Sequence, residues 1–485
     1  MKNHEKSAGF WEKMRKILGE NDFQKFEKFQ KKPLRKTIRV NLLKNSVDEF
    51  LAWAAKNHSD WILTPHAFSP EVFFIDRKNR KTPLGATLGH ASGRFYLQEA
   101  SSTIPPKALF LEKNLKILDA AAAPGSKTTQ IAAEISNSGL LVANEFSASR
   151  AKILVFNLQK CGVKNAIITN FSAEKFGEKM PNFFDRILLD APCTGEGTFR
   201  KDKSALEKWS EKKILSAAKL QKNLIENAFL SLAENGILVY STCTLAPEEN
   251  EFVVDFLQKK FPENAEILDL KNLFPGAEKA AGLLKYENRE IKNGEKMLRI
   301  WPHYFDSEGF FVAAIRKKFP TKSEKKPRFV FHGKKVNLKT KILFWKDPIA
   351  QKILHFLKKE FCFEIPKIGV LTRKNADIFW TPPHSEKLFQ TLKIDRPGLK
   401  LGKIAGDDFR ISSEAAIALG KNFSGNRVVN VSKIDAEKFL RGENLPSADE
   451  IPRGDVVIFC ENLPIGIAKN LGKILKNNLP RNFLK

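Results

Sequence analysis

LKILDAAAAPGSKTTQIAAEIS, residues 115–136, changes its pattern twice within one short stretch. It begins with a short apolar run, LKILDA, which is typical of a buried strand. AAAPGSK follows, and its Pro124 and Gly125 predict a turn. TTQIAAEIS then has the composition and spacing of a helix. The stretch therefore predicts a strand, a tight turn and a helix in succession, the opening unit of an α/β sheet.

The alternation of strands and helices continues on the carboxyl-terminal side. Apolar runs predict further strands at 139–145, 165–170, 184–192 and 236–243, and a late strand at 309–317. Helical patterns separate the first of these runs, and the longest covers 204–236. This order is typical of a doubly wound, Rossmann-like α/β fold with a mainly parallel sheet. Ligands bind such sheets beyond the carboxyl ends of the strands, so the loops there are the candidate sites.

Composition divides the chain into four predicted segments. Residues 1–92 mix helical and strand patterns in an α+β subdomain, and residues 93–318 hold the Rossmann-like core. The core opens with 95–111, which resembles a helix broken by two prolines. A charged linker and a poorly periodic intermediate segment cover 319–403, and 404–485 resembles a small β-rich domain.

The chain is strongly basic, with 82 Lys and Arg against 55 Asp and Glu and a formal net charge of +27. A charge of this size bears on partners rather than on fold. It fits either solubility or the binding of a polyanion, most simply nucleic acid. The start does not resemble a signal peptide, and no apolar run is long enough to cross a membrane. We therefore expect a cytoplasmic protein without a membrane partner, and, lacking an oligomerisation pattern, a monomer.

The first turn and the strands that follow it favour a nucleoside ligand. AAAPGSK lacks the G-x-G-x-x-G pattern of dinucleotide sites and the pattern of a P-loop. Glu145 ends the second predicted strand, where a carboxylate can hold ribose hydroxyls. Asn170 to Ser172 end the third, where an adenine edge could be bonded. A neutral loop of this kind favours an adenosine without phosphates, and S-adenosylmethionine fits. The alternative is a purely structural turn with an incidental glutamate.

Two of the five cysteines end neighbouring predicted strands. Cys193 follows LLDAP and Cys243 follows GILVYST, whereas the other three are scattered. No CxxC pair occurs, and the histidines are scattered too, so neither a disulfide framework nor a metal site is expected. Lone cysteines are usually small buried apolar residues. For this pair a chemical role is favoured, because Cys243 precedes a predicted helix whose dipole would lower its pKa.

A thiolate suits methyl transfer to a pyrimidine ring. Carbon 5 of cytosine is not nucleophilic, but attack of a thiolate on carbon 6 makes it so. A base must then remove the proton from carbon 5 before the thiolate can leave, and a second thiol nearby could assist. Asp190, on the same loop as Cys193, could bond the ring nitrogen or the amino edge of the base.

Four motifs resemble one family closely. DAAAAPGSKTTQIA, LLDAPCTGEGTFRKD, YSTCTLAPEENE and RIWPHYFDSEGFF are similar to those of the sun-type RNA cytosine-5 methyltransferases, and most like its bacterial RsmF branch, which acts on 16S ribosomal RNA. KPLRKTIRVN resembles the amino-terminal RNA-binding subdomain of that family, and GIAKNLGKILKNNLPR its PUA-like RNA-binding domain. The resemblance covers almost the whole chain.

The resemblance implies a role for each matching residue. Cys243 would be the nucleophile, which attacks a base flipped out of the RNA, and Cys193 would assist product release. S-adenosylmethionine would lie against Glu145, residue 172, Asp190 and the turn residues Ala121, Ala122, Ala123, Pro124, Gly125, Ser126 and Lys127. The family usually has an acid where Ser172 stands, which implies weaker binding of the cofactor.

Several alternatives remain open at this point. Lys127 could pair with Asp190 or only support the turn, and Arg39 and Asn41 could fix the first subdomain or contact RNA. His303 is expected to pack or to contact RNA rather than to catalyse. The RNA could be 16S ribosomal RNA or the small ribosomal subunit, but transfer RNA fits the motifs equally. The other alternative is an RNA-binding assembly factor whose methyltransferase domain is vestigial.

Overall fold

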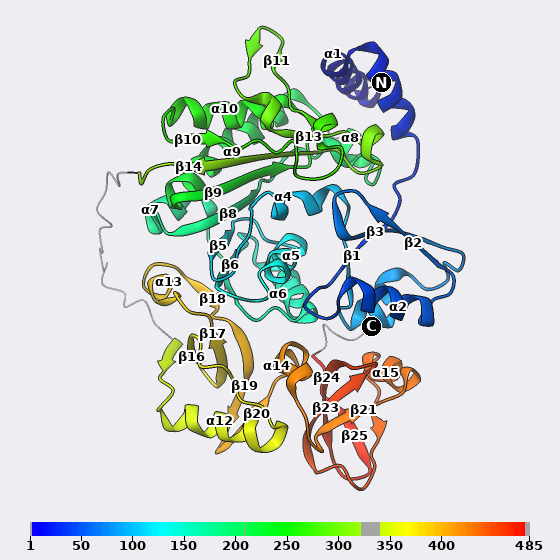
Figure 1. Ribbon diagram of the computed structural model, residues 1–485, viewed down its shortest axis with the longest axis vertical. Coiled ribbons are helices and arrows are strands. Elements are labelled where there is room, and N and C mark those ends of the chain that lie inside the picture. Colours follow the sequence, from blue (N-terminus) through cyan, green and yellow to red (C-terminus); the bar gives the residue numbers. More distant parts are fainter. Residues whose placement is uncertain (1, 208, 322–339, 481–485) are drawn as a thin grey trace.

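A mixed sheet of nine strands forms the centre of the molecule (Figure 1). The computed structural model describes residues 2–207, 209–321 and 340–480. The strand order is β10-β14-β9-β8-β5-β6-β7-β18, with β13 paired to β14 off this path. Five neighbouring strands are parallel: β5 (Lys116–Asp119), β6 (Leu140–Asn144), β7 (Ala166–Thr169), β8 (Phe184–Asp190) and β9 (Leu232–Thr242). The antiparallel strands are β10 (Ala265–Ile267), β13 (Leu298–Ile300), β14 (Phe310–Lys317) and β18 (Ile394–Arg396).

Helices cover both faces of this sheet, as a doubly wound fold requires. One face packs against α4 (Ile104–Lys107), α5 (Ser126–Glu134) and α6 (Ala148–Cys161). The other packs against α7 (Phe176–Lys179), α9 (Glu211–Ser231) and α10 (Glu251–Lys260). Each interface is a continuous apolar core, and burying such area is the main force that holds the layers together. The predicted Rossmann-like α/β fold is confirmed.

Two of the sequence-based element predictions need correction. Residues 95–111, predicted as a broken helix, begin with strand β4 (Phe95–Leu97), and their helical part is limited to a 3₁₀ turn at Ser101–Thr103 and to α4 with its two prolines in the first turn. The long helix predicted over 204–236 ends at Ser231, because Leu232 already pairs with β8 as the start of β9. A short α8 (Ser204–Glu207) precedes α9 as a separate piece. Tertiary pairing overrode the helical composition of these segments.

The amino-terminal part forms a four-stranded antiparallel sheet in the order β2-β3-β1-β4. Its other strands are β1 (Thr37–Val40), β2 (Trp61–His66) and β3 (Ser69–Arg77), and its helices are α1 (Lys2–Gln30), α2 (Val47–Asn57) and α3 (Leu88–Ala91). Ser46 and Glu49 close a capping box at the start of α2. Gly19 interrupts α1 with a φ of 69°, and the helix packs beside α8 and α11 (Pro302–Phe305).

Buried polar contacts fix this subdomain to the central sheet. Arg39 is 2% exposed, and its guanidinium donates to the carbonyl oxygen of Ser126 at 2.7 Å and to Thr129 Oγ1 at 2.8 Å. The amide of Asn41 donates to the carbonyl oxygens of Gly93 and Cys161. Of the two roles left open for Arg39 and Asn41, the structure therefore supports the fixing of the subdomain.

Residues 340–411 form a further sheet that the sequence did not reveal. Its order is β15-β16-β17-β19-β20, and it packs on α12 (Pro348–Phe361). Its strands are β15 (Thr340–Leu343), β16 (Val370–Lys374), β17 (Asp377–Thr381), β19 (Leu399–Ala405) and β20 (Asp408–Ile411). β19 and β20 pair across the predicted boundary at 403/404, and most of the predicted linker lies outside the described residues.

The last part of the chain is a second five-stranded sheet, in the order β21-β23-β24-β25-β22. It contains β21 (Val428–Asn430), β22 (Leu445–Pro446), β23 (Gly454–Cys460), β24 (Leu463–Asn470) and β25 (Ile474–Asn477), with α15 (Lys433–Leu440). α13 (Glu386–Thr391) leads from β17 to β18 of the central sheet, and α14 (Ser413–Leu419) connects the two lower sheets. β11 (Lys285–Tyr286) and β12 (Arg289–Glu290) form a hairpin on the core. The two small sheets lie side by side below the central one (Figure 1).

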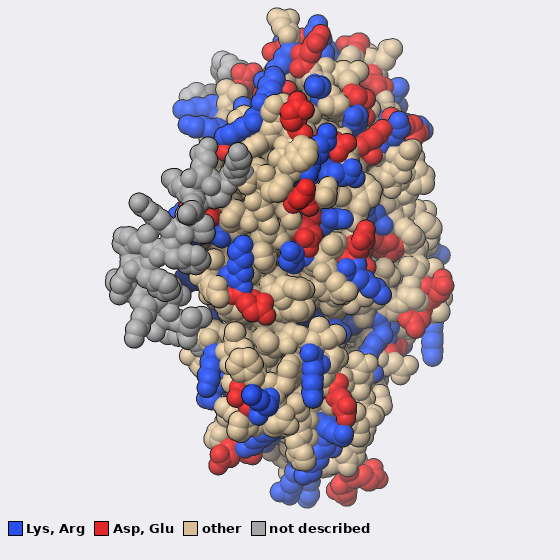
Figure 2. Space-filling view, turned by 60° about the vertical axis from the view of Figure 1, so that its left-hand side comes forward, with Lys and Arg blue, Asp and Glu red and all other residues tan. Residues whose placement is uncertain are grey.

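Charged side chains are interspersed on the face shown in Figure 2. Lys and Arg alternate there with Asp and Glu over the upper and the lower part of the molecule, without one dominant patch. On this face, the basic residues therefore lie over several parts of the molecule and not over one part alone. In the part of the chain that the structure describes, no helix combines the length and the apolar character needed to cross a membrane.

Candidate active site

Cys193 and Cys243 meet at the carboxyl ends of two adjacent parallel strands. β8 ends at Asp190 and β9 at Thr242, and the register pairs Asp190 with Ser241. The sulfur atoms of the two cysteines lie 3.3 Å apart, and neither cysteine is in a disulfide. The structure thus brings the two thiols together at this edge of the sheet, where the sequence predicts them to lie.

A contact between two glycines supports the loop of Cys243. Gly197 donates its backbone N–H to the carbonyl oxygen of Cys243 at 2.8 Å, and its carbonyl oxygen accepts from Gly309 N at 3.0 Å. A Cβ on Gly197 would lie 2.1 Å from the carbonyl oxygen of Gly309 and 2.8 Å from that of Cys243. Any side chain at this position would therefore push the loop of Cys243 out of place.

The two thiols have different surroundings. The hydrogen bond with Cys243 and burial raise the pKa of Cys193 well above its ordinary value, and the negative charges of Glu249 and Asp190 add to the effect. Cys193 is therefore held as a protonated thiol. The predicted helix amino terminus beside Cys243 is farther away than expected, because the first turn is the 3₁₀ segment Pro247–Glu249 and α10 begins only at Glu251.

Asp190 forms an ion pair with Lys127 next to the thiols. Lys127 Nζ lies 2.7 Å from Asp190 Oδ2, and Asp190 Oδ1 accepts from the hydroxyl of Ser241 at 2.9 Å. Burial alone would lower the pKa of Lys127, but the charge of Asp190 and its hydrogen bond raise it overall. Of the two roles left open for Lys127, pairing with Asp190 is the one observed.

Contacts with β6 and α6 support the turn between β5 and α5. Gly125 has a φ of 106°, which favours glycine, and a Cβ on it would lie 3.1 Å from Leu154. The carbonyl oxygen of Pro124 accepts from the amide of Asn157 at 2.8 Å, and Ala122 N donates to the carbonyl oxygen of Asn144 at 2.8 Å. The turn residues 121–127 thus form a preformed, nearly neutral rim at the carboxyl end of the sheet.

Glu145 and residues 170–172 continue this rim along β6 and β7. Glu145 is buried, its Oε1 accepts from Ser147 N at 2.8 Å, and its Oε2 lies 3.5 Å from Arg150. The amide of Asn170 donates to the carbonyl oxygens of Glu145 and Phe146. These donors and acceptors, with no phosphate cradle, fit the ribose and adenine of S-adenosylmethionine.

Two further residues stand out that the sequence reasoning missed. Phe146 directly follows Glu145, and it is 75% exposed, so its ring is free to stack on an adenine. Its place one residue after Glu145, the acid predicted to hold the ribose, was the available signal. Glu308 is buried beside the Gly309 contact, and its Oε1 has no hydrogen-bond partner among the described residues. Burial and the nearby Glu99 raise the pKa of Glu308 to about 7.

His303 has a packing role. Its ring contacts Phe26 and Tyr304, with centroids 5.9 and 4.3 Å away, and burial lowers its pKa to about 4. Within the described residues, no group of three or more His, Cys, Asp or Glu side chains is arranged to hold a metal ion.

Comparison with known proteins shows to which family the chain belongs. Sequence models described as 16S rRNA methyltransferase RsmB/F, its RsmF N-terminal domain and the RsmF PUA domain match residues 106–316, 7–100 and 426–485. Proteins named ribosomal RNA small subunit methyltransferase F from Shewanella woodyi and Citrobacter koseri are 40% and 41% identical over 95% and 94% of this chain, and over 92% and 91% of their own lengths. The chain belongs to the methyltransferase F family.

Solved structures agree with the fold of this methyltransferase F family member. A methyltransferase homolog protein from Pyrococcus horikoshii aligns with a TM-score of 0.55 and 33% identity, covering 63% of this chain and 93% of its own. The structure of NSun6 from Pyrococcus horikoshii gives a TM-score of 0.53 at 24% identity, over 64% of this chain and 97% of its own. The second likeness shows the fold alone.

Ser172 stands where the resemblance implies an acid, and replacing it tests the predicted cofactor site. Its hydroxyl donates to Glu174 Oε2 at 3.3 Å. We expect Ser172→Asp to lower the Kd for S-adenosylmethionine by about threefold to tenfold, because a charged acceptor strengthens a hydrogen bond from the adenine amino group. Isothermal titration calorimetry measures this directly.

The matched control is Ser172→Ala, which should change the Kd little. A second background, Glu174→Gln, removes the carboxylate that would repel the new one. Equal affinities of the wild type and Ser172→Asp in both backgrounds would show that position 172 does not contact the cofactor.

Proposed function

We propose that this protein transfers a methyl group from S-adenosylmethionine to carbon 5 of a cytosine in 16S ribosomal RNA. The observation that carries the proposal is the pair of sulfur atoms of Cys193 and Cys243, 3.3 Å apart beside the Lys127–Asp190 ion pair. The names of the relatives support the choice of RNA, since they act on the small ribosomal subunit by description.

Cys243 is the proposed nucleophile. Its thiolate attacks ring carbon 6 and forms a carbon–sulfur bond, which makes carbon 5 nucleophilic. When bound, S-adenosylmethionine supplies an electrophilic methyl group to that carbon. The proton of carbon 5 then passes to water, the double bond between carbons 5 and 6 re-forms, and the carbon–sulfur bond breaks to release the thiolate of Cys243.

Cys193 assists the last of these steps in the proposed mechanism. As a protonated thiol beside Cys243, it can donate a hydrogen bond to the sulfur that leaves the base. A donor placed where negative charge develops lowers the barrier to departure. Asp190 contacts the ring nitrogen or amino edge of the cytosine, and the ammonium of Lys127 holds that carboxylate in position.

The cofactor is proposed to lie along the rim described above. The turn residues 121–127 approach it closely, Glu145 binds the ribose, Ser172 faces the adenine, and Asp190 lies near its methionine end. Lys127 is ion-paired with Asp190, which leaves the rim suited to a ligand without phosphates. Phe146 supplies a ring for the adenine to stack on.

The test is transfer of labelled methyl groups to defined RNAs. Small ribosomal subunits, naked 16S ribosomal RNA and transfer RNA are incubated with the enzyme and S-adenosylmethionine, and the digested nucleosides are identified by mass spectrometry. We expect 5-methylcytidine in ribosomal RNA. If 5-methylcytidine appeared only in transfer RNA, transfer RNA would be the substrate instead. Its absence from all three RNAs would favour the RNA-binding assembly factor.

The basic chain predicts a steep salt dependence of RNA binding. Each phosphate contact with Lys or Arg releases counterions, so affinity falls with a slope of about −0.7 per contact on a double logarithmic plot. With about five contacts, we expect roughly a 100-fold weaker affinity at 200 mM than at 50 mM salt. Fluorescence anisotropy of a labelled RNA fragment measures the slope. A constant Kd over this range would contradict an electrostatic mode of binding.

A further inference from the structure

Glu249 touches both of the loops that carry the two thiols. Its Oε2 accepts from Thr194 N at 3.1 Å, and its Oε1 accepts from the hydroxyls of Thr194 and Thr244, the latter at 3.3 Å. Thr194 and Thr244 each directly follow a cysteine, and their hydroxyl oxygens are 3.1 Å apart. One carboxylate therefore joins the residues next to Cys193 and Cys243.

A second side chain fixes the other flank of Cys193. The amide of Gln221, on α9, donates to Glu249 Oε2 at 2.8 Å and to the carbonyl oxygen of Pro192 at 2.9 Å. Cys193 is thus held on both sides by groups that meet at Glu249. The backbone of Glu249 is itself held, since Tyr240 donates its hydroxyl to the carbonyl oxygen at 2.5 Å.

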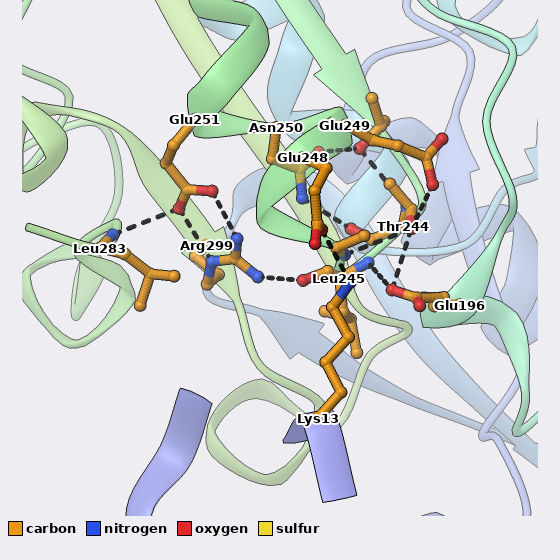
Figure 3. Close-up of polar contacts among 12 residues, drawn as sticks. Lys13, Glu196, Thr244, Leu245, Glu248, Glu249, Asn250, Glu251, Leu283 and Arg299 are labelled. Atoms are coloured by element: carbon orange, nitrogen blue, oxygen red, sulfur yellow. Dashed lines mark hydrogen bonds and ion pairs between the residues drawn. The ribbon is translucent and has the colours of Figure 1, made fainter. Parts of the chain in front are cut away.

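Glu249 has a different environment from its two acidic neighbours (Figure 3). Glu248 turns to Lys13, and Glu251 turns to Arg299, so both are paired with cations. Within the described residues, Glu249 forms no ion pair, although it is fully buried. Burial raises its pKa to about 7, and the nearby Glu196 adds to this.

A buried carboxyl group without a cation is a poor stabiliser, since an apolar residue of similar volume would serve stability as well. Its carboxylate contacts both cysteine loops instead. We propose that Glu249 is a positioning residue that sets the separation of the two thiols, so that Cys193 lies beside the sulfur that must leave the base. This inference rests on the two-thiol mechanism proposed above.

Three substitutions separate geometry from charge. Glu249→Gln removes the charge but keeps the shape, because its amide oxygen can accept from Thr194 N and Gln221 while its amide nitrogen donates to the hydroxyls. Glu249→Ala removes charge and contacts together. Glu249→Asp keeps the charge on a side chain too short to reach both loops. The control is Glu248→Ala, which removes the neighbouring acid that is paired with Lys13.

The first measurement needs neither RNA nor cofactor. Diamide oxidises two adjacent thiols to a disulfide and is itself reduced to the hydrazine, and peptide mapping quantifies the bond between Cys193 and Cys243. The wild type, Glu249→Gln and Glu248→Ala should form it at rates within about threefold of one another. Glu249→Ala and Glu249→Asp should be at least tenfold slower. Equal rates in all five proteins would overturn the proposal.

The second measurement follows multiple turnovers on the RNA that the wild type methylates. In Glu249→Ala and Glu249→Asp, kcat should fall at least tenfold with KM changed less than threefold, and a covalent adduct through Cys243 should accumulate. A role in folding alone would lower the amount of active enzyme without any adduct, and that result would overturn the inference. If Glu249→Ala does not fold, the comparison of Glu249→Asp with Glu249→Gln decides. A wild type that makes no 5-methylcytidine would instead refute the proposed function.

Discussion

Replacing Cys243 with alanine is expected to lower the rate of methyl transfer by about 10⁴-fold or more, because the ring cannot be activated without the thiolate. Cys193→Ala is expected to behave differently. It leaves the attacking sulfur in place but removes the neighbouring thiol, 3.3 Å away, that faces the leaving group. The reaction should then stop after methyl transfer, with the RNA still bonded to Cys243.

A denaturing gel distinguishes the two variants. Cys193→Ala incubated with S-adenosylmethionine and small-subunit RNA should give a slowly migrating protein–RNA band, and sequencing the attached RNA locates the cytosine. The control is Cys193→Ala/Cys243→Ala, which should give no band. A band that persists in the double variant would assign the nucleophile to another residue, and a band in Cys243→Ala alone would exchange the roles of the two thiols.

The second large effect is expected on stability, at Arg299. Its side chain is 0% exposed, and its guanidinium donates to both oxygens of Glu251, at 3.0 and 2.5 Å, and to the carbonyl oxygen of Leu245 at 2.6 Å. We expect Arg299→Ala to lower the free energy of unfolding by about 3–5 kcal/mol, because it leaves the carboxylate of Glu251 buried with the backbone N–H of Leu283 but without a cation to balance its charge.

Urea denaturation of the core transition measures this loss. The matched control is Arg316→Ala, because Arg316 forms an exposed pair with Glu266 at 3.5 Å. That change should cost less than about 1 kcal/mol. The double variant Arg299→Met/Glu251→Leu should recover much of the stability, since both charges are removed together. A loss at Arg299 no larger than that at Arg316 would contradict the importance of the buried pair.

The sequence predicted the parts of this molecule that local patterns determine. The strand, turn and helix over 115–136 are found as expected, and so are the two adjacent strand ends that bring Cys193 and Cys243 together. The reason is physical: in a parallel sheet the strand order and polarity place all carboxyl ends on one edge. A residue that follows a buried apolar run can therefore be assigned to that edge without coordinates.

Parts that depend on distant contacts could not be predicted in this way. Glu249 and Gln221 each look like ordinary helix residues, and only the fold reveals that both reach the loop of Cys193. The sequence pattern did not predict the sheet over 340–411, because its strands are short and separated by helical segments. Arg39 was ambiguous for the same reason, since its partners on α5 lie far along the chain.

Strand β18 follows the core in sequence and forms the edge strand of the central sheet beside β7. Its residues 394–396 pair with β7, whose outer edge would otherwise expose unpaired backbone groups. The sheet of β15–β17, β19 and β20 is therefore tied to the central sheet by the main-chain bonds of β18, which lies between β17 and β19 in sequence. A chain ended at residue 318 would retain every proposed catalytic group but would carry a bare strand edge, open to pairing with other molecules. We therefore expect such a fragment to aggregate more readily than the full chain.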